Sequence, residues 1–288
     1  MGIVEKTAPV SSPRGAFPLW GFFALSHGWT WLFWSVPLLS GTDAWSRSNV
    51  VFIYLGGVGP LLAGIVMTAV VRGQRGLQDL WQRLIDLRRI GGEWYGVIFL
   101  LPPLVTLLAA GIAHLFGAAG QPLDPGPLLE RLRHPASLLF FVVFIFLLGP
   151  LPEEIGWRGY ALDRLQERWS ALTASLVLGF AWGLWHLPLF FMENYYQNFG
   201  GEAPDPLRFF YDIILSTILI TWIYNNTRRS VLAAVLFHFM LNLSGELLPV
   251  SAQVELYKTA LTTAVVTVVV WYWGFERLSR HDRSPEGV

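Results

Sequence analysis

The stretch FFVVFIFLLGPLPEEIGWRGY, residues 140–160, places two glutamates and an arginine directly behind a long apolar run. Such a run has the length and composition of a membrane-spanning helix. A charged side chain inside a membrane costs about 2.5–3.5 kcal/mol even on a lenient insertion scale. Glu153, Glu154 and Arg158 are therefore expected to face one another, or a water-filled cavity, inside a helical membrane protein.

The composition of the whole chain agrees with a membrane location. Of its 288 residues, 53% are apolar and 14% are charged, whereas soluble domains carry about 25% charged residues. Lys and Arg balance Asp and Glu at 20 each, which leaves no net field to attract a nucleic acid. The absence of cysteine excludes disulfides, thiolate metal sites and thiol nucleophiles.

Eight stretches of the sequence are long and apolar enough to span a membrane, which takes about 20 residues per helix. They predict an all-α, polytopic transmembrane helical bundle that forms a single domain over residues 16–278. The polar segments 1–15 and 279–288 are expected to be disordered tails. The predicted spans are 17–39, 51–71, 94–116, 136–152, 170–192, 209–226, 230–249 and 257–275.

The distribution of basic residues predicts the orientation of these spans. With both termini in the cytoplasm, 15 of the 20 Lys and Arg residues fall in cytoplasmic segments, as the positive-inside rule requires. Between the second and third spans, residues 76–90 combine an apolar face with a charged face at helical spacing. This pattern predicts an amphipathic helix in the cytoplasmic membrane interface.

Polar motifs interrupt three of the predicted spans, at residues 153–158, 182–186 and 238–242. Each motif alone has an ordinary structural explanation. Glu154 and Arg158 lie four residues apart and can form an ion pair on one helix face, and histidines can bond neighbouring helices. Together, two carboxylates, two histidines and an amide favour a site that activates water and stabilises an oxyanion.

Each residue type suits one task in the hydrolysis of a peptide bond. Glu153 would act as general base toward water, and His186 would orient that water or protonate the leaving amine. His238 and Asn242 share one helix face, so both could donate hydrogen bonds to the oxyanion. Glu154 paired with Arg158 would fix Glu153 in place.

Residue spacing alone leaves other uses of these side chains open. Glu153, His186 and His238 could instead be zinc ligands, with the second glutamate as base, although the usual HExxH signature is absent. Buried Glu, His and Arg also mark the proton and ion pathways of transporters. A catalytically silent immunity or scaffold protein could use the same pocket to hold a partner.

The motifs EEIGWRGY, GFAWGLWHLPLF and RRSVLAAVLFHFMLN resemble those of the CPBP family, the CAAX proteases and bacteriocin-processing enzymes, also called Abi. The family includes the type II CAAX prenyl endopeptidases. Its pattern is EExxxR, FxxxH and HxxxN on three transmembrane helices. Trp182 stands here where the family usually has Phe. The resemblance extends over roughly residues 75–245.

This resemblance implies an intramembrane endopeptidase, integral to a prokaryotic cell membrane and open toward the cytoplasmic half of that membrane. Glu153 and His186 would activate water, while His238 and Asn242 bind the oxyanion. The reaction would need no metal, with zinc as the alternative cofactor. The expected partners are membrane lipid and a lipidated or membrane-anchored protein or peptide, prenylated CAAX termini among them, and not nucleic acid. The motifs assign no substrate-binding residue.

The predicted spans place these residues at different depths. At about 1.5 Å per helical residue, His186 would lie about 24 Å and His238 about 12 Å from the cytoplasmic start of their spans. Glu153 would lie near the membrane edge. For the three to meet, either the fourth helix continues past Glu153 or the fifth begins outside the membrane. We expect the fifth helix to begin near Leu165, and Glu153 and His186 to approach within about 8 Å.

Overall fold

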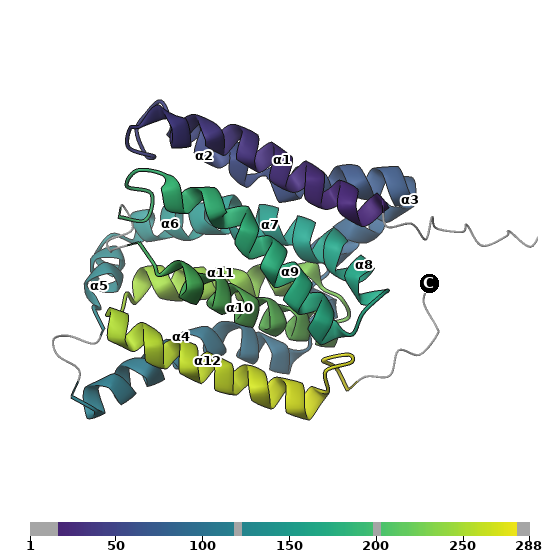
Figure 1. Ribbon diagram of the computed structural model, residues 1–288. Coiled ribbons are helices and arrows are strands. Elements are labelled where there is room, and N and C mark those ends of the chain that lie inside the picture. The colour runs from purple at the N-terminus through teal and green to yellow at the C-terminus, as the bar shows by residue number, and fades with distance from the viewer. Residues whose placement is uncertain (1–16, 118–122, 198–202, 281–288) are drawn as a thin grey trace, which may run out of the picture.

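The computed structural model describes residues 17–117, 123–197 and 203–280, and over these residues the protein is a bundle of helices (Figure 1). No strand occurs in the described ranges, where an isolated bridge joins Leu123 to Val250. The predicted all-α fold class is confirmed. The tail predicted at 1–15, and the part of the C-terminal tail beyond Arg280, lie outside the described residues.

The helices follow the predicted apolar stretches, with short elements between them. They are α1 (Phe17–Ser40), α2 (Val50–Gly57), α3 (Gly59–Ile85), η1 (Leu87–Arg89), α4 (Gly92–Leu115), α5 (Gly126–Arg133), α6 (Pro135–Leu148), α7 (Pro150–Gly156), η2 (Trp157–Ala161), α8 (Leu162–Gln166), α9 (Ala171–His186), η3 (Leu187–Phe191), α10 (Pro206–Asn226), α11 (Val231–Leu247) and α12 (Ala252–Trp273).

Within the described part of the chain, six helical segments are long and apolar enough to cross a membrane. The protein is therefore a polytopic membrane protein. Helix α11 is apolar but shorter than these six. The total of eight spans, which would also count α1 and α11, stays a prediction. The six segments are Val50–Ile85, Gly92–Leu115, Pro135–Gln166, Ala171–Phe191, Pro206–Asn226 and Ala252–Trp273.

The fourth predicted span is longer than its apolar run suggests, because α6, α7, η2 and α8 follow one another over Pro135–Gln166. The path breaks at Gly149, whose φ of −123° and ψ of −90° leave the helical region. Pro150 follows it as the first residue of α7, where its missing N–H costs no helical hydrogen bond. Glu153 consequently lies well inside this helical segment instead of at its edge.

The expectation that the fifth span begins near Leu165 is wrong. Helix α9 begins at Ala171, and the hydroxyl of Ser170 caps it by accepting a hydrogen bond from the backbone N–H of Thr173. Leu165 belongs to α8, the last part of the preceding segment. The sequence also allows Glu153 to reach the depth of the two histidines if the fourth helix continues past it. The structure shows this continuation.

The segment predicted as an interfacial helix continues directly from the second span. Helix α3 is kinked at Gly73, where a φ of 60° requires a residue without a side chain. Beyond the kink, Leu80 and Arg83 turn into the bundle, whereas Trp81 and Ile85 are exposed. The apolar face is thus divided between the protein interior and the outside of the bundle.

Two glycines let α7 pack closely against α3. A Cβ atom on Gly156 would meet the backbone carbonyl of Pro60, and one on Gly64 would lie 2.9 Å from the carbonyl oxygen of Ile155. Real Cβ atoms do not approach so closely, because the cores of proteins are close-packed. The absence of side chains at these positions therefore fixes the helix that carries Glu153 and Glu154.

A buried ionic cluster ties the ends of four elements together. Asp163 binds Arg83 at 3.1 Å, forms an ion pair with Arg229, and accepts a hydrogen bond of 2.9 Å from the hydroxyl of Tyr224. Arg83 also donates to the backbone carbonyl of Gly159 at 3.0 Å. Because Gly159 lies in the π-helical turn η2, the cluster supports the turn that follows the two glutamates.

The basic segments gather at one end of the bundle, where Figure 1 places α8, the loop after α12 and the far part of α3. The opposite end carries α5 and the loop between α9 and α10. The cavity described below is lined by Trp45, Tyr195 and Pro204 in connecting segments at this second end. This part of the cavity therefore lies toward the end of the bundle opposite to most of the basic segments.

The orientation can be tested with single cysteines, because the chain has none of its own. If basic residues set the orientation, a Ser48→Cys variant will react with a membrane-impermeant maleimide in intact cells. An Arg75→Cys variant will react only after permeabilisation. Labelling in the reverse order would contradict this orientation and place the cavity end in the cytoplasm.

Candidate active site

The three polar motifs converge around Trp182 in the interior of the bundle. Its indole N–H donates a 2.6 Å hydrogen bond to the carboxylate of Glu153, and its ring centroid lies 5.0 Å from that of His238. Its backbone carbonyl lies 2.8 Å from Nδ1 of His186. Residues from α7, α9 and α11 are thus brought together although they are far apart in sequence.

Glu154 is the centre of a buried hydrogen-bonded group. Its Oε1 atom accepts a hydrogen bond of 2.7 Å from Arg158 and lies 2.9 Å from Nδ1 of His238. Glu154 and Arg158 are completely buried, and His238 is 5% exposed. The ion pair predicted between Glu154 and Arg158 is present. This pair holds His238, whereas the carboxylate of Glu153 is held by Trp182.

The hydrogen bonds to the two histidines define what their second ring nitrogen can do. Since the Trp182 carbonyl only accepts, Nδ1 of His186 carries the proton, and Nε2 of the neutral ring is an acceptor. Nδ1 of His238 likewise donates to the Glu154 carboxylate. Nε2 of His238 can therefore donate only when both ring nitrogens carry a proton.

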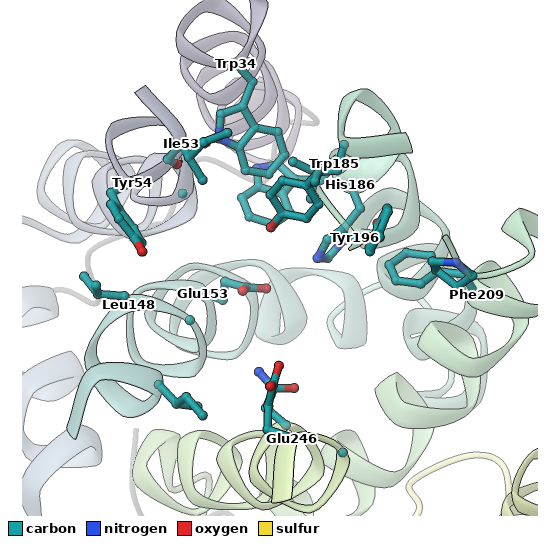
Figure 2. Close-up of a pocket in the computed structure, with 18 of the residues that line it drawn as sticks. Trp34, Ile53, Tyr54, Leu148, Glu153, Trp185, His186, Tyr196, Phe209 and Glu246 are labelled. Atoms are coloured by element: carbon teal, nitrogen blue, oxygen red, sulfur yellow. Dashed lines mark hydrogen bonds between the residues drawn. The ribbon is translucent and has the colours of Figure 1, made fainter. Parts of the chain in front are cut away.

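Two connected lobes of a cavity meet at these residues. Glu153, His186 and Asn242 line both lobes, and Figure 2 shows Glu153 and His186 on the same open space. The aromatic lobe, of about 810 Å³, includes Trp34, Trp45, Tyr54, Phe144, Trp185 and Tyr195. The charged lobe, of about 920 Å³, includes Asp205, Arg208, Asp212, Glu255 and Lys258.

Asn242 lies one turn beyond His238 on α11, as their spacing predicts. Its amide nitrogen is near Gly149, where an added Cβ atom would lie 3.7 Å from it. The break between α6 and α7 therefore lies beside this amide. All four residues predicted to be catalytic line the cavity, with His238 in the charged lobe.

Several cavity residues were not identified from the sequence. Glu246 lies on α11 and lines the aromatic lobe. The four-residue spacing from His238 through Asn242 to Glu246 was a signal that could have identified it. Tyr195 follows α9 and η3 and carries no such signal. Burial raises the pKa of the Tyr195 hydroxyl, which therefore stays protonated at neutral pH.

In the described part of the chain, the side chains can also be compared with the ligand geometry of a metal site. Over the described ranges, no group of three or more His, Asp or Glu side chains is arranged to hold a metal ion. The use of zinc, with Glu153, His186 and His238 as ligands, stays an untested alternative. In addition, Nδ1 of His238 is directed to the Glu154 carboxylate.

The structure is a polytopic helical bundle with carboxylates and histidines around a cavity. Its sequence relatives place it in the class of membrane-embedded hydrolases. The family model described as type II CAAX prenyl endopeptidase Rce1-like matches residues 135–244, which contain all three motifs. The protein named CAAX prenyl protease 2 from Methanococcus maripaludis is 31% identical over 251 residues. That alignment covers 84% of this chain and 89% of the relative. The chain belongs to the type II CAAX prenyl endopeptidase Rce1-like family.

The buried Arg158 can be tested by its effect on stability. Replacing Arg158 with Met leaves the Glu154 carboxylate without its strongest compensating charge, which should lower the free energy of unfolding by about 3–5 kcal/mol. The measurement is unfolding of the purified protein in detergent, by heat or denaturant. Arg133→Met is the matched control, because that arginine pairs with Glu130 at the surface and should contribute at most about 1 kcal/mol. Equal effects of the two substitutions would contradict this account.

Proposed function

We propose that this protein is an intramembrane endopeptidase that cleaves a peptide bond near the membrane-anchored, prenylated CAAX-type end of a protein or peptide. The observation that carries the proposal is the shared cavity of Glu153, His186 and Asn242 in a chain of this family. The name of the archaeal relative supports the substrate class, and its source supports a prokaryotic cell membrane as the location.

The proposed reaction begins with a water molecule between Glu153 and His186. The Glu153 carboxylate takes a proton from this water while the water oxygen attacks the scissile carbonyl carbon. His186 accepts a hydrogen bond at Nε2 and so orients the water, because its Nδ1–H donates to the Trp182 carbonyl. The hydrogen bond from the Trp182 indole keeps the Glu153 carboxylate directed at the site.

The carbonyl oxygen gains negative charge as the tetrahedral intermediate forms, and Asn242 and His238 would donate to it. For His238 this role requires a proton on Nε2 in addition to the Nδ1 proton that is donated to the Glu154 carboxylate. Arg158 balances the charge of Glu154. The protonated Glu153 then returns its proton to the leaving amine as the C–N bond breaks, which completes the hydrolysis.

The aromatic lobe supports a lipidated substrate. Its walls come largely from aromatic and aliphatic side chains, among them Trp34, Tyr54, Phe144 and Leu148. Large apolar pockets of several hundred Å³ enclose apolar ligands with few directing polar groups. A prenyl chain could therefore be buried in this lobe while the peptide passes Glu153. Membrane lipid is the surrounding partner, and no role for nucleic acid is proposed.

The proposal is tested with purified protein and a quenched, prenylated peptide. Glu153→Gln and His186→Ala should each lower kcat by about 10²–10⁴, because general acid–base groups contribute factors of this size. Glu130→Gln, a substitution at the surface, is the control for a lost carboxylate. We propose a metal-independent reaction, so a strong zinc chelator should leave the rate unchanged.

Each other outcome has a distinct meaning. Cleavage that survives both substitutions would show that these residues are not catalytic, as in a silent binding protein. Cleavage that disappears with chelator and returns with zinc would reject the metal-independent reaction but not the protease. Absence of cleavage in the unsubstituted protein, over a panel of prenylated peptides, would reject the substrate class.

A further inference from the structure

The aromatic lobe of the cavity contains a second carboxylate, Glu246, that the proposed reaction does not use. Glu246 lies in the last turn of α11, four residues after Asn242 and eight after His238. Figure 2 shows Glu246 and Glu153 on opposite sides of the same space. A negative charge in the last turn of a helix is unfavourable, because the C-terminal end of the helix dipole is itself negative. The interaction of Glu246 with the helix dipole therefore does not stabilise the fold.

Among the described residues, no protein group satisfies the Glu246 carboxylate. Within the part of the chain that the structure describes, Glu246 makes no hydrogen bond and no ion pair. The charge of Arg131 reaches it electrostatically, but the guanidinium of Arg131 lies 3.3 Å from the ring centroid of Phe141. Glu246 is half-buried in the wall of the aromatic lobe. A carboxylate in an apolar wall that has no bonding partner in the protein is suited to bind a group of an incoming ligand.

The other groups of the aromatic lobe favour a cation in that place. The described residues that line it include Glu153 and Glu246 but no Lys or Arg. Aromatic side chains, among them Trp45, Tyr54 and Tyr195, make up much of its wall. The faces of such rings attract cations. The Tyr195 hydroxyl lies within electrostatic reach of both carboxylates, and its protonated state adds no further negative charge.

We propose that Glu246 binds the side chain of a lysine or arginine in the substrate, about two residues from the scissile bond. The distance follows from α11, where four residues rise about 6 Å. An extended peptide advances about 3.4 Å per residue, so the separation from Asn242 corresponds to about two residues. The inference rests on the proposed function, because it takes Asn242 as the site of the oxyanion.

The experiment compares pairs of lipidated peptides that differ only by acetylation of one lysine. Acetylation removes the charge and leaves the chain in place. The lysine is placed in turn at each position within three residues of the scissile bond. At one of these positions, kcat/KM for the charged peptide should exceed that for the acetylated peptide about tenfold, as expected for one charge-assisted hydrogen bond.

Substitutions at Glu246 then assign this preference. Glu246→Gln should reduce the ratio of the two kcat/KM values to about one, and Glu246→Lys should invert it. Glu246→Asp keeps the charge and should keep a preference, which separates charge from packing. Glu130→Gln removes a carboxylate outside the cavity and should leave the ratio at its original value.

The outcomes separate this inference from the proposed function. A ratio of about one at every position in the unsubstituted protein, or a preference that survives Glu246→Gln, would overturn the role of Glu246 while peptide cleavage stands. An equal loss of cleavage of both peptides in Glu246→Gln would also overturn it, because that pattern indicates a structural role. Failure to cleave any lipidated peptide would instead reject the protease assignment.

Discussion

The arrangement of the site depends on how charge is neutralised in an apolar helical bundle. Glu154 and Arg158 are completely buried, and neither could remain there alone, because an uncompensated charge in such surroundings costs several kcal/mol. Nδ1 of His238, on helix α11, also forms a hydrogen bond with the Glu154 carboxylate of this ion pair. The Glu154 carboxylate therefore balances the charge of Arg158 and, through its hydrogen bond with His238, fixes the rotation of α11. This leaves Glu153, next to it in sequence, to face the cavity.

Much of the fold could be predicted from the sequence, because apolar length and polar interruption are local properties. The helical class and the coincidence of helices with apolar stretches followed from these properties. The path of the fourth helix did not. Its continuation past Glu153 depends on the break at Gly149, the π-helical turn at 157–161 and the close packing of Gly156 on α3. These are three-dimensional conditions, so the predicted start of the fifth helix at Leu165 was wrong.

The candidate site was predictable to a similar extent. Motif spacing identified Glu153, Glu154 and Arg158 and the residues on α9 and α11, but not which carboxylate each partner would bind. The hydrogen bond from Trp182 to Glu153 arises where the family usually has Phe, whose ring has no N–H to donate. The catalytic roles of these residues stay proposals. Glu246 was missed because no motif includes it, although it continues the same helix face.

The two lobes of the cavity join at Glu153, His186 and Asn242, and this shape has a consequence for which bond is cut. If the proposed function is correct, a lipid buried in the aromatic lobe and the peptide attached to it both reach this junction. The link between lipid and peptide would then act as a ruler, and the cut would fall at a fixed count of residues from the attachment point. The count would decide whether a substrate is cut, and the preference proposed for Glu246 would rank the substrates that share the same count.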